Sequence, residues 1–95
     1  MGRGEEKAGF KVSLTSQAYK NLAKLLKTDE SLARRISERI DSLSQDPMQG
    51  KPLKGSLKGK RSLRSGDYRI VYTLDMAARE VLVINMGHRR EIYDR

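Results

Sequence analysis

Basic side chains are concentrated in one short stretch, residues 59–72, which read GKRSLRSGDYRIVY. Lys60, Arg61, Arg64 and Arg69 all fall within it. Cations held on ordered strands can meet the charge of a phosphodiester at a defined point, and so can stabilise the charge that develops on it during cleavage. The same side chains on a purely solvated surface would only keep the protein soluble. The stretch is therefore a candidate site for a polyanion.

A second candidate group lies near the C-terminal end, in the segment INMGHRREIY. It contains His88, the single histidine of the chain, which excludes an RNA-cleaving mechanism that uses two histidines. The chain has no cysteine, so disulfides and thiolate metal sites are also excluded. One histidine cannot form a histidine-rich metal site either. We therefore expect no metal and no cofactor.

The charge of the chain is uneven. Residues 51–95 hold eleven of the twenty Lys and Arg residues and five of the twelve Asp and Glu residues, so this part carries +6 of the net charge of +8. A polyanionic partner such as nucleic acid is the natural inference. No apolar run approaches the roughly 18 residues of a membrane span, and no signal-peptide pattern is present. We expect a soluble, cytoplasmic protein.

The elements that must position these cations can be read from periodicity. The chain of 95 residues suits one domain, and we expect a mobile leader over residues 1–9 before a single domain at 10–95. Thr15 can cap a first amphipathic helix over residues 16–27, with Ala18, Leu22, Leu25 and Leu26 on its apolar face. A second helix runs from residue 30 to about 44, and the short connection makes the two a hairpin.

Four strands complete the predicted fold. Residues 10–14 alternate apolar and polar side chains, as a half-buried strand does, and residues 60–65, 68–74 and 80–86 are three further strand candidates. A loop over 47–59 contains both prolines, and Ser65-Gly66-Asp67 is a tight-turn signal. The order β-α-α-β-β-β predicts an α+β fold in which the helical hairpin packs on one face of a small antiparallel-rich sheet.

Alternation also assigns side chains to faces. Lys60, Arg64 and Arg69 should share the face away from the helices, where they could converge on one concavity. In the last strand, Leu82, Ile84 and Met86 should alternate with Val81, Val83 and Asn85, and two apolar sets indicate an interior strand. His88 and Arg89 should emerge just beyond its end.

The motifs KPLKG, LRSGDYRIVY and INMGHRREIY, in this order, resemble those of the RelE/ParE toxin superfamily, and more closely its RelE branch. The resemblance covers roughly residues 10–95. It implies the toxin of a type II toxin–antitoxin system: a metal-independent endoribonuclease that enters the ribosomal A site and cleaves mRNA there by attack of the 2′-hydroxyl. It also implies an acidic, RelB-like antitoxin as partner.

The same resemblance implies roles for individual residues. Arg69 matches a phosphate-binding arginine, and Arg89 matches a second arginine that acts as general acid or electrostatic stabiliser. Tyr93 matches a tyrosine that stacks on an A-site base or touches the reacting hydroxyl. Lys60 is also a candidate catalytic residue, because it matches one of two lysines on the first hairpin strand, and Ser62 stands where the second would be.

Two further expectations come from the chemistry of these side chains. Arginine is a poor proton donor, so His88 is the better proton carrier beside Arg89. The identity of the general base stays open, because Ser62 replaces the family lysine. His88 or a lysine of the loop from Lys54 to Lys58 could take its place. The remaining cations of the basic region are expected to contact RNA or rRNA: Lys54, Lys58, Arg61 and Arg64.

Two alternative functions remain open at this point. A ParE-like toxin that poisons gyrase would share the fold and the Y-R-I-x-Y hairpin. A catalytically degenerate member would only bind RNA or its antitoxin, and Ser62 is the residue that keeps this alternative open.

Overall fold

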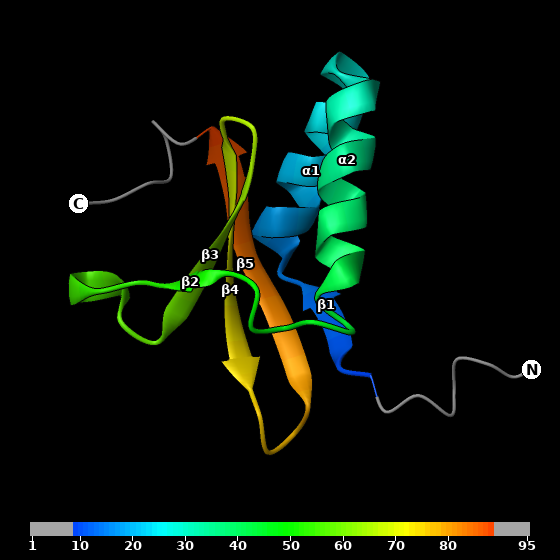
Figure 1. The fold of residues 1–95 in the computed structure, drawn as a ribbon. Helices are drawn as coiled ribbons and strands as arrows, with labels where there is room; N and C mark the ends of the chain where they lie inside the picture. Colours follow the sequence, from blue (N-terminus) through cyan, green and yellow to red (C-terminus); the bar gives the residue numbers. More distant parts are fainter. Residues whose placement is uncertain (1–8, 89–95) are drawn as a thin grey trace, which may run out of the picture.

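Two helices lie against one side of a five-stranded sheet in the computed structural model, which describes residues 9–88 (Figure 1). The elements run in the order β1 (Lys11–Leu14), α1 (Ser16–Thr28), α2 (Glu30–Ser42), β2 (Lys51–Pro52), a 3-10 helix (Gly55–Leu57), β3 (Lys60–Ser65), β4 (Tyr68–Asp75) and β5 (Glu80–His88). The predicted α+β fold is confirmed, and β2 is an additional short strand inside the predicted loop. The predicted leader falls almost wholly outside the described residues.

Side chains of the flanking residues define the helix ends. Thr15 accepts a hydrogen bond from the backbone N–H of Ala18 at 3.1 Å, which confirms the predicted cap of α1. Asp29 serves both helices, because its backbone N–H donates to the carbonyl of Leu25 and its carboxylate accepts from the N–H of Leu32. Neither helix within residues 9–88 is long and apolar enough to cross a membrane.

The sheet has the strand order β1-β5-β4-β3-β2. β1 pairs with β5 in parallel, and the other neighbours are antiparallel. β5 therefore lies between β1 and β4, which confirms the predicted interior position. The turn from β3 to β4 places Gly66 at a φ of 61°, a conformation that favours glycine. This two-residue turn aligns Ser65 with Tyr68 and so sets the register of the whole hairpin.

The helices bury one face of the sheet, where α1 contacts β5 and α2 contacts β3. The core between the layers is formed by Phe10, Ala18, Ile36, Ile40, Leu43, Leu63, Ile70, Tyr72, Val81, Val83 and Met86. Leu26, predicted on the buried face of α1, is 52% exposed, because it lies toward the outer side of the helical hairpin. No helix or strand within the described part of the chain covers the opposite face of the sheet (Figure 1). We call this the open face.

A β-bulge interrupts the alternation of β5. Val71 is aligned with Asn85, but the next residue of β4, Tyr72, is aligned with Val83, so Ile84 is the extra residue. The predicted grouping of Met86 with Leu82 is therefore wrong. Met86 is only 2% exposed and shares the core with Val83, because one extra residue moves every following side chain to the other face.

Candidate nucleic-acid interface

The open face carries cations from two neighbouring strands. Arg64 of β3 is aligned directly with Arg69 of β4, and Ser62 is aligned with Val71. Arg64 is exposed, and Arg69 is half-buried with its Nη1 donating to the Ser62 hydroxyl at 3.4 Å. Lys60 shares this face but is aligned with Thr73. The structure thus confirms the shared face.

Lys60 and Arg64 occupy opposite ends of that face. The four-residue separation along β3 corresponds to about 13 Å between their backbones. A ligand at the pair formed by Arg64 and Arg69 would need to extend along the strands to reach Lys60. An extended polymer fits this spacing better than a small anion does.

Two like charges in direct cross-strand alignment are unfavourable for the sheet. Arg64 and Arg69 form such an aligned pair, and an opposite charge bound between them would reduce their repulsion. An anionic group bound here would be met by two guanidinium groups whose strands are already in position. The aligned pair is therefore a candidate site for an anionic group.

His88 occupies a different face. It is the last residue of β5, rather than a residue beyond the strand as predicted, and it is aligned with Tyr68. The two rings contact in a T-shaped arrangement with centroids 6.1 Å apart. Tyr68 lies on the helix side of the sheet, because it alternates with Arg69. The structure therefore places His88 and Arg69 at the same end of the sheet but on opposite faces.

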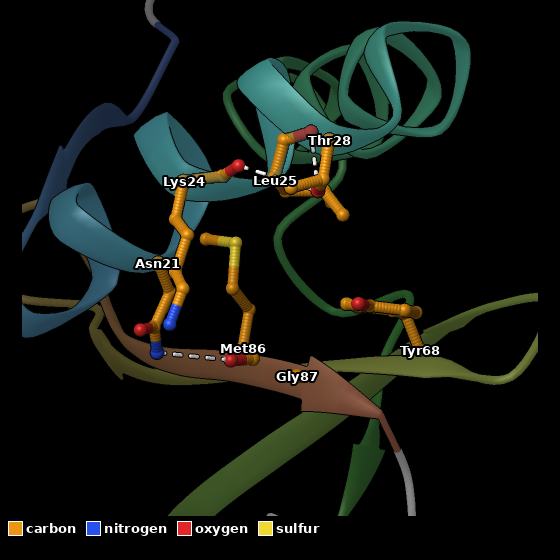
Figure 2. Close-up of a pocket in the computed structure, with 7 residues that line it drawn as sticks. All are labelled: Asn21, Lys24, Leu25, Thr28, Tyr68, Met86 and Gly87. Carbon is orange, nitrogen blue, oxygen red and sulfur yellow. Dashed lines mark hydrogen bonds between the residues drawn. The ribbon is translucent and has the colours of Figure 1, made fainter.

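A cavity of about 300 Å³ opens next to Tyr68, between α1 and the ends of β4 and β5 (Figure 2). Its floor is formed by Met86 and Gly87, and the side chain of Lys24 reaches over it from the helix. The described residues that line it are Asn21, Lys24, Leu25, Thr28, Tyr68, Met86 and Gly87. Sequence reasoning missed this cavity, because its two walls lie at least forty residues apart in the chain.

Arg61 is placed away from the open face. Its Nε donates to the carbonyl of Gly50 at 3.1 Å, and its Nη2 donates to the carbonyl of Met48 at 3.2 Å. The side chain is half-buried and is aligned with Tyr72 on the helix side of the sheet. Its guanidinium therefore holds the loop that precedes β2, whereas sequence reasoning predicted an RNA contact.

The remaining predicted residues fall into two groups. Lys54 and Lys58 are exposed and flank the 3-10 helix, where they are accessible to a polyanion. Arg89 and Tyr93 lie outside the described residues. Across residues 9–88, no three His, Cys, Asp or Glu side chains lie close enough together to hold a metal ion.

Comparison with known proteins identifies a family and several relatives. The family model described as the ParE toxin of the type II toxin–antitoxin system, parDE, matches residues 12–93. Toxin RelG of Mycobacterium tuberculosis is 34% identical over 87 residues, which covers 90% of this chain and 98% of the relative. Toxin RelE of the same organism is 34% identical over 86 residues, which covers 88% and 86%.

A solved structure agrees with these relatives. The toxin–antitoxin complex RelBE2 from Mycobacterium tuberculosis superimposes with a TM-score of 0.76 at 30% sequence identity, covering 90% of this chain and 97% of that chain. The two layers described above are therefore shared with a protein that was solved as a complex with its antitoxin.

Proposed function

Because this chain belongs to the RelE/ParE superfamily of toxins from type II toxin–antitoxin systems, we propose that it is a ribosome-dependent endoribonuclease that cleaves mRNA in the A site. The observation that carries the proposal is the aligned pair of Arg64 and Arg69 on the open face. The two arginines form a preorganised site for a backbone phosphate, with exposed Lys54 and Lys58 in the basic loop before β3.

The proposed reaction needs no group outside the protein and the RNA. The 2′-oxygen attacks the adjacent phosphorus, the bond to the 5′-oxygen breaks, and a 2′,3′-cyclic phosphate and a 5′-hydroxyl result. A base must take the proton of the 2′-hydroxyl, an acid must protonate the 5′-oxygen, and cations must stabilise the charge on the phosphorane. In the proposal, Arg69 and Arg89 stabilise this charge and Lys60 contacts the RNA along the same face.

His88 and Tyr93 have the remaining proposed roles. Tyr93 stacks on a base, as in the family, and His88 carries a proton. Because His88 faces the opposite side of the sheet from Arg69, the RNA must pass around the end where β4 begins and β5 ends if it is to contact both. The cavity beside Tyr68 lies on that side, next to His88.

The proposed antitoxin is an acidic, RelB-like protein. Its acidic segment would neutralise the open face, which no element within residues 9–88 covers. Isothermal titration calorimetry with a purified RelB-like antitoxin measures the interaction. Arg64→Gln should weaken binding, and absence of binding to the wild-type chain would contradict the partner assignment.

A cleavage assay tests the proposed activity. One sample holds labelled mRNA on ribosomes with an empty A site, and the other holds the same mRNA without ribosomes. We expect cleavage at codon positions in the first sample only. Arg69→Gln should reduce the rate by about 100-fold or more, because it removes one group that stabilises the transition state. Arg34→Gln removes the same charge from the helical layer and should leave the rate within about twofold.

The family model favours one other candidate function, because its description names the ParE toxin. A ParE-like protein would poison gyrase and would cut no RNA. A DNA supercoiling assay with purified gyrase separates the two. Inhibition of gyrase together with intact mRNA in both cleavage samples would replace the endoribonuclease proposal.

A further inference from the structure

Within residues 9–88, the C-terminal part of β5 has no strand neighbour on the side where β1 lies. β1 pairs with β5 only as far as the alignment of Leu14 with Val83, whereas β5 continues to His88. The backbone groups of the last residues on this edge must therefore find other partners, because unpaired backbone groups at the edge of a core are costly. This is the end of β5 that faces Arg69 and Tyr68.

Helix α1 supplies those partners. The backbone N–H of Thr15 donates to the carbonyl of Val83 at 3.0 Å, and its hydroxyl donates to the carbonyl of Ile84 at 2.7 Å. One turn and a half further along the helix, the side-chain amide of Asn21 donates to the carbonyl of Met86 at 3.1 Å (Figure 2). Thr15 and the first part of α1 thus provide hydrogen-bond donors to β5 where its pairing with β1 ends.

Asn21 also holds the bulge. Its Nδ2 donates to Oδ1 of Asn85 at 2.7 Å, and the same oxygen accepts from the backbone N–H of Met86 at 2.8 Å. The side-chain amide of Asn21 therefore contacts both Asn85 and Met86, the two residues between the bulge and Gly87. The helix is itself fixed by the core, where Ala18 is fully buried. Asn21 therefore holds this part of β5 from a helix that is packed in the core.

We infer that Asn21 is a positioning residue, which fixes Gly87 and His88 opposite Arg69 and Tyr68 by holding the bulged end of β5 against α1. The effect on cleavage rests on the proposed function, whereas the effect on the position of β5 does not. Thr15 does not duplicate this contact, because its hydrogen bonds to β5 are made with Val83 and the bulge residue Ile84, and not with Asn85 or Met86.

Two matched substitutions test the inference. Asn21→Asp keeps the size of the side chain but removes the donor and places a carboxylate oxygen against the Met86 carbonyl. Asn85→Asp adds the same charge at the other end of the same hydrogen bond, yet its oxygen still accepts from Asn21 and from the Met86 N–H. Both variants therefore add one negative charge, but only Asn21→Asp removes the hydrogen bonds that Asn21 donates to Asn85 and Met86. Asn21→Ala removes the donor without adding charge, and serves if Asn21→Asp does not fold.

The first measurement is amide hydrogen exchange by NMR. In Asn21→Asp we expect exchange at Met86, Gly87 and His88 to accelerate by about tenfold or more, with Asn85→Asp close to wild type. The second is turnover on programmed ribosomes, where Asn21→Asp should lower kcat by about tenfold or more and leave KM within about twofold. A purely structural role would lower thermal stability without this division between kcat and KM.

Three outcomes would overturn the inference. Exchange in Asn21→Asp equal to wild type would show that the contact does not fix β5. Equal effects of Asn21→Asp and Asn85→Asp would show that charge, and not the donor, matters. Accelerated exchange with unchanged kcat would show a structural contact with no positioning role. If the wild-type chain cleaves no mRNA, the proposed function fails, and the exchange measurement still decides whether Asn21 fixes the end of β5.

Discussion

Removal of one buried hydroxyl group should measurably destabilise this domain. Tyr72 is fully buried, and its hydroxyl donates to the carbonyl of Pro47 at 2.7 Å and accepts from the N–H of Gly50 at 3.0 Å. Tyr72→Phe leaves both backbone groups buried without this partner. An unsatisfied buried group costs about 1–3 kcal/mol, so we expect a loss of about 2–3 kcal/mol in the free energy of unfolding.

Urea denaturation followed by circular dichroism measures this loss. The melting temperature should also fall, by roughly 8–24 °C for a domain of this size. Tyr19→Phe is the matched control, because it removes the same group from a side chain that is 66% exposed. The denaturant slope should stay the same in both variants, since the surface exposed on unfolding hardly changes. A difference below about 0.5 kcal/mol between the two variants would refute the importance of the buried hydroxyl.

Three further outcomes can be measured by denaturation. A Cβ at Gly50 would lie 2.6 Å from the Tyr72 hydroxyl oxygen. Gly50→Ala should therefore lower the free energy of unfolding by about 1–3 kcal/mol. A double-mutant cycle should show a smaller loss in the Tyr72→Phe background, where this oxygen is absent. Asp29→Ala should cost about 1 kcal/mol through loss of the α2 cap, and Asp29→Asn, which keeps the acceptor, much less. Arg64→Gln should raise the melting temperature slightly at low salt, and the gain should disappear near 1 M salt, where the charges are screened; a loss of stability at low salt would contradict the repulsion.

The sequence by itself determined the features that depend on near neighbours in the chain. Thr15 and Asp29 mark helix ends because a side-chain oxygen reaches an N–H only three residues away. The pairing of Arg64 with Arg69 also follows from the sequence, because a two-residue turn headed by Gly66 leaves a single register for the strands on either side. The core face of β4 follows from simple alternation.

Contacts between distant segments decided the rest. The alternation of side chains between the two faces of β5 fails at Ile84, because Thr15 and Asn21 hold the bulge there. Thr15 lies 69 residues before Ile84 in the chain, so no local pattern shows this contact. The same bulge places Met86 in the core. Asn85, the one polar residue in the run of residues 81–86, was the sequence signal for this irregularity.

The faces of the candidate site were decided in the same way. Sequence reasoning grouped Arg61 with the RNA contacts, but its guanidinium is held by carbonyls of a loop eleven and thirteen residues away. It also grouped His88 with Arg69 as parts of one site, whereas the alignment of β4 with β5 places them on opposite faces. Composition and local pattern determine which side chains the chain offers for chemistry. Only strand register, fixed by packing across the whole domain, determines which of them can meet the same phosphate.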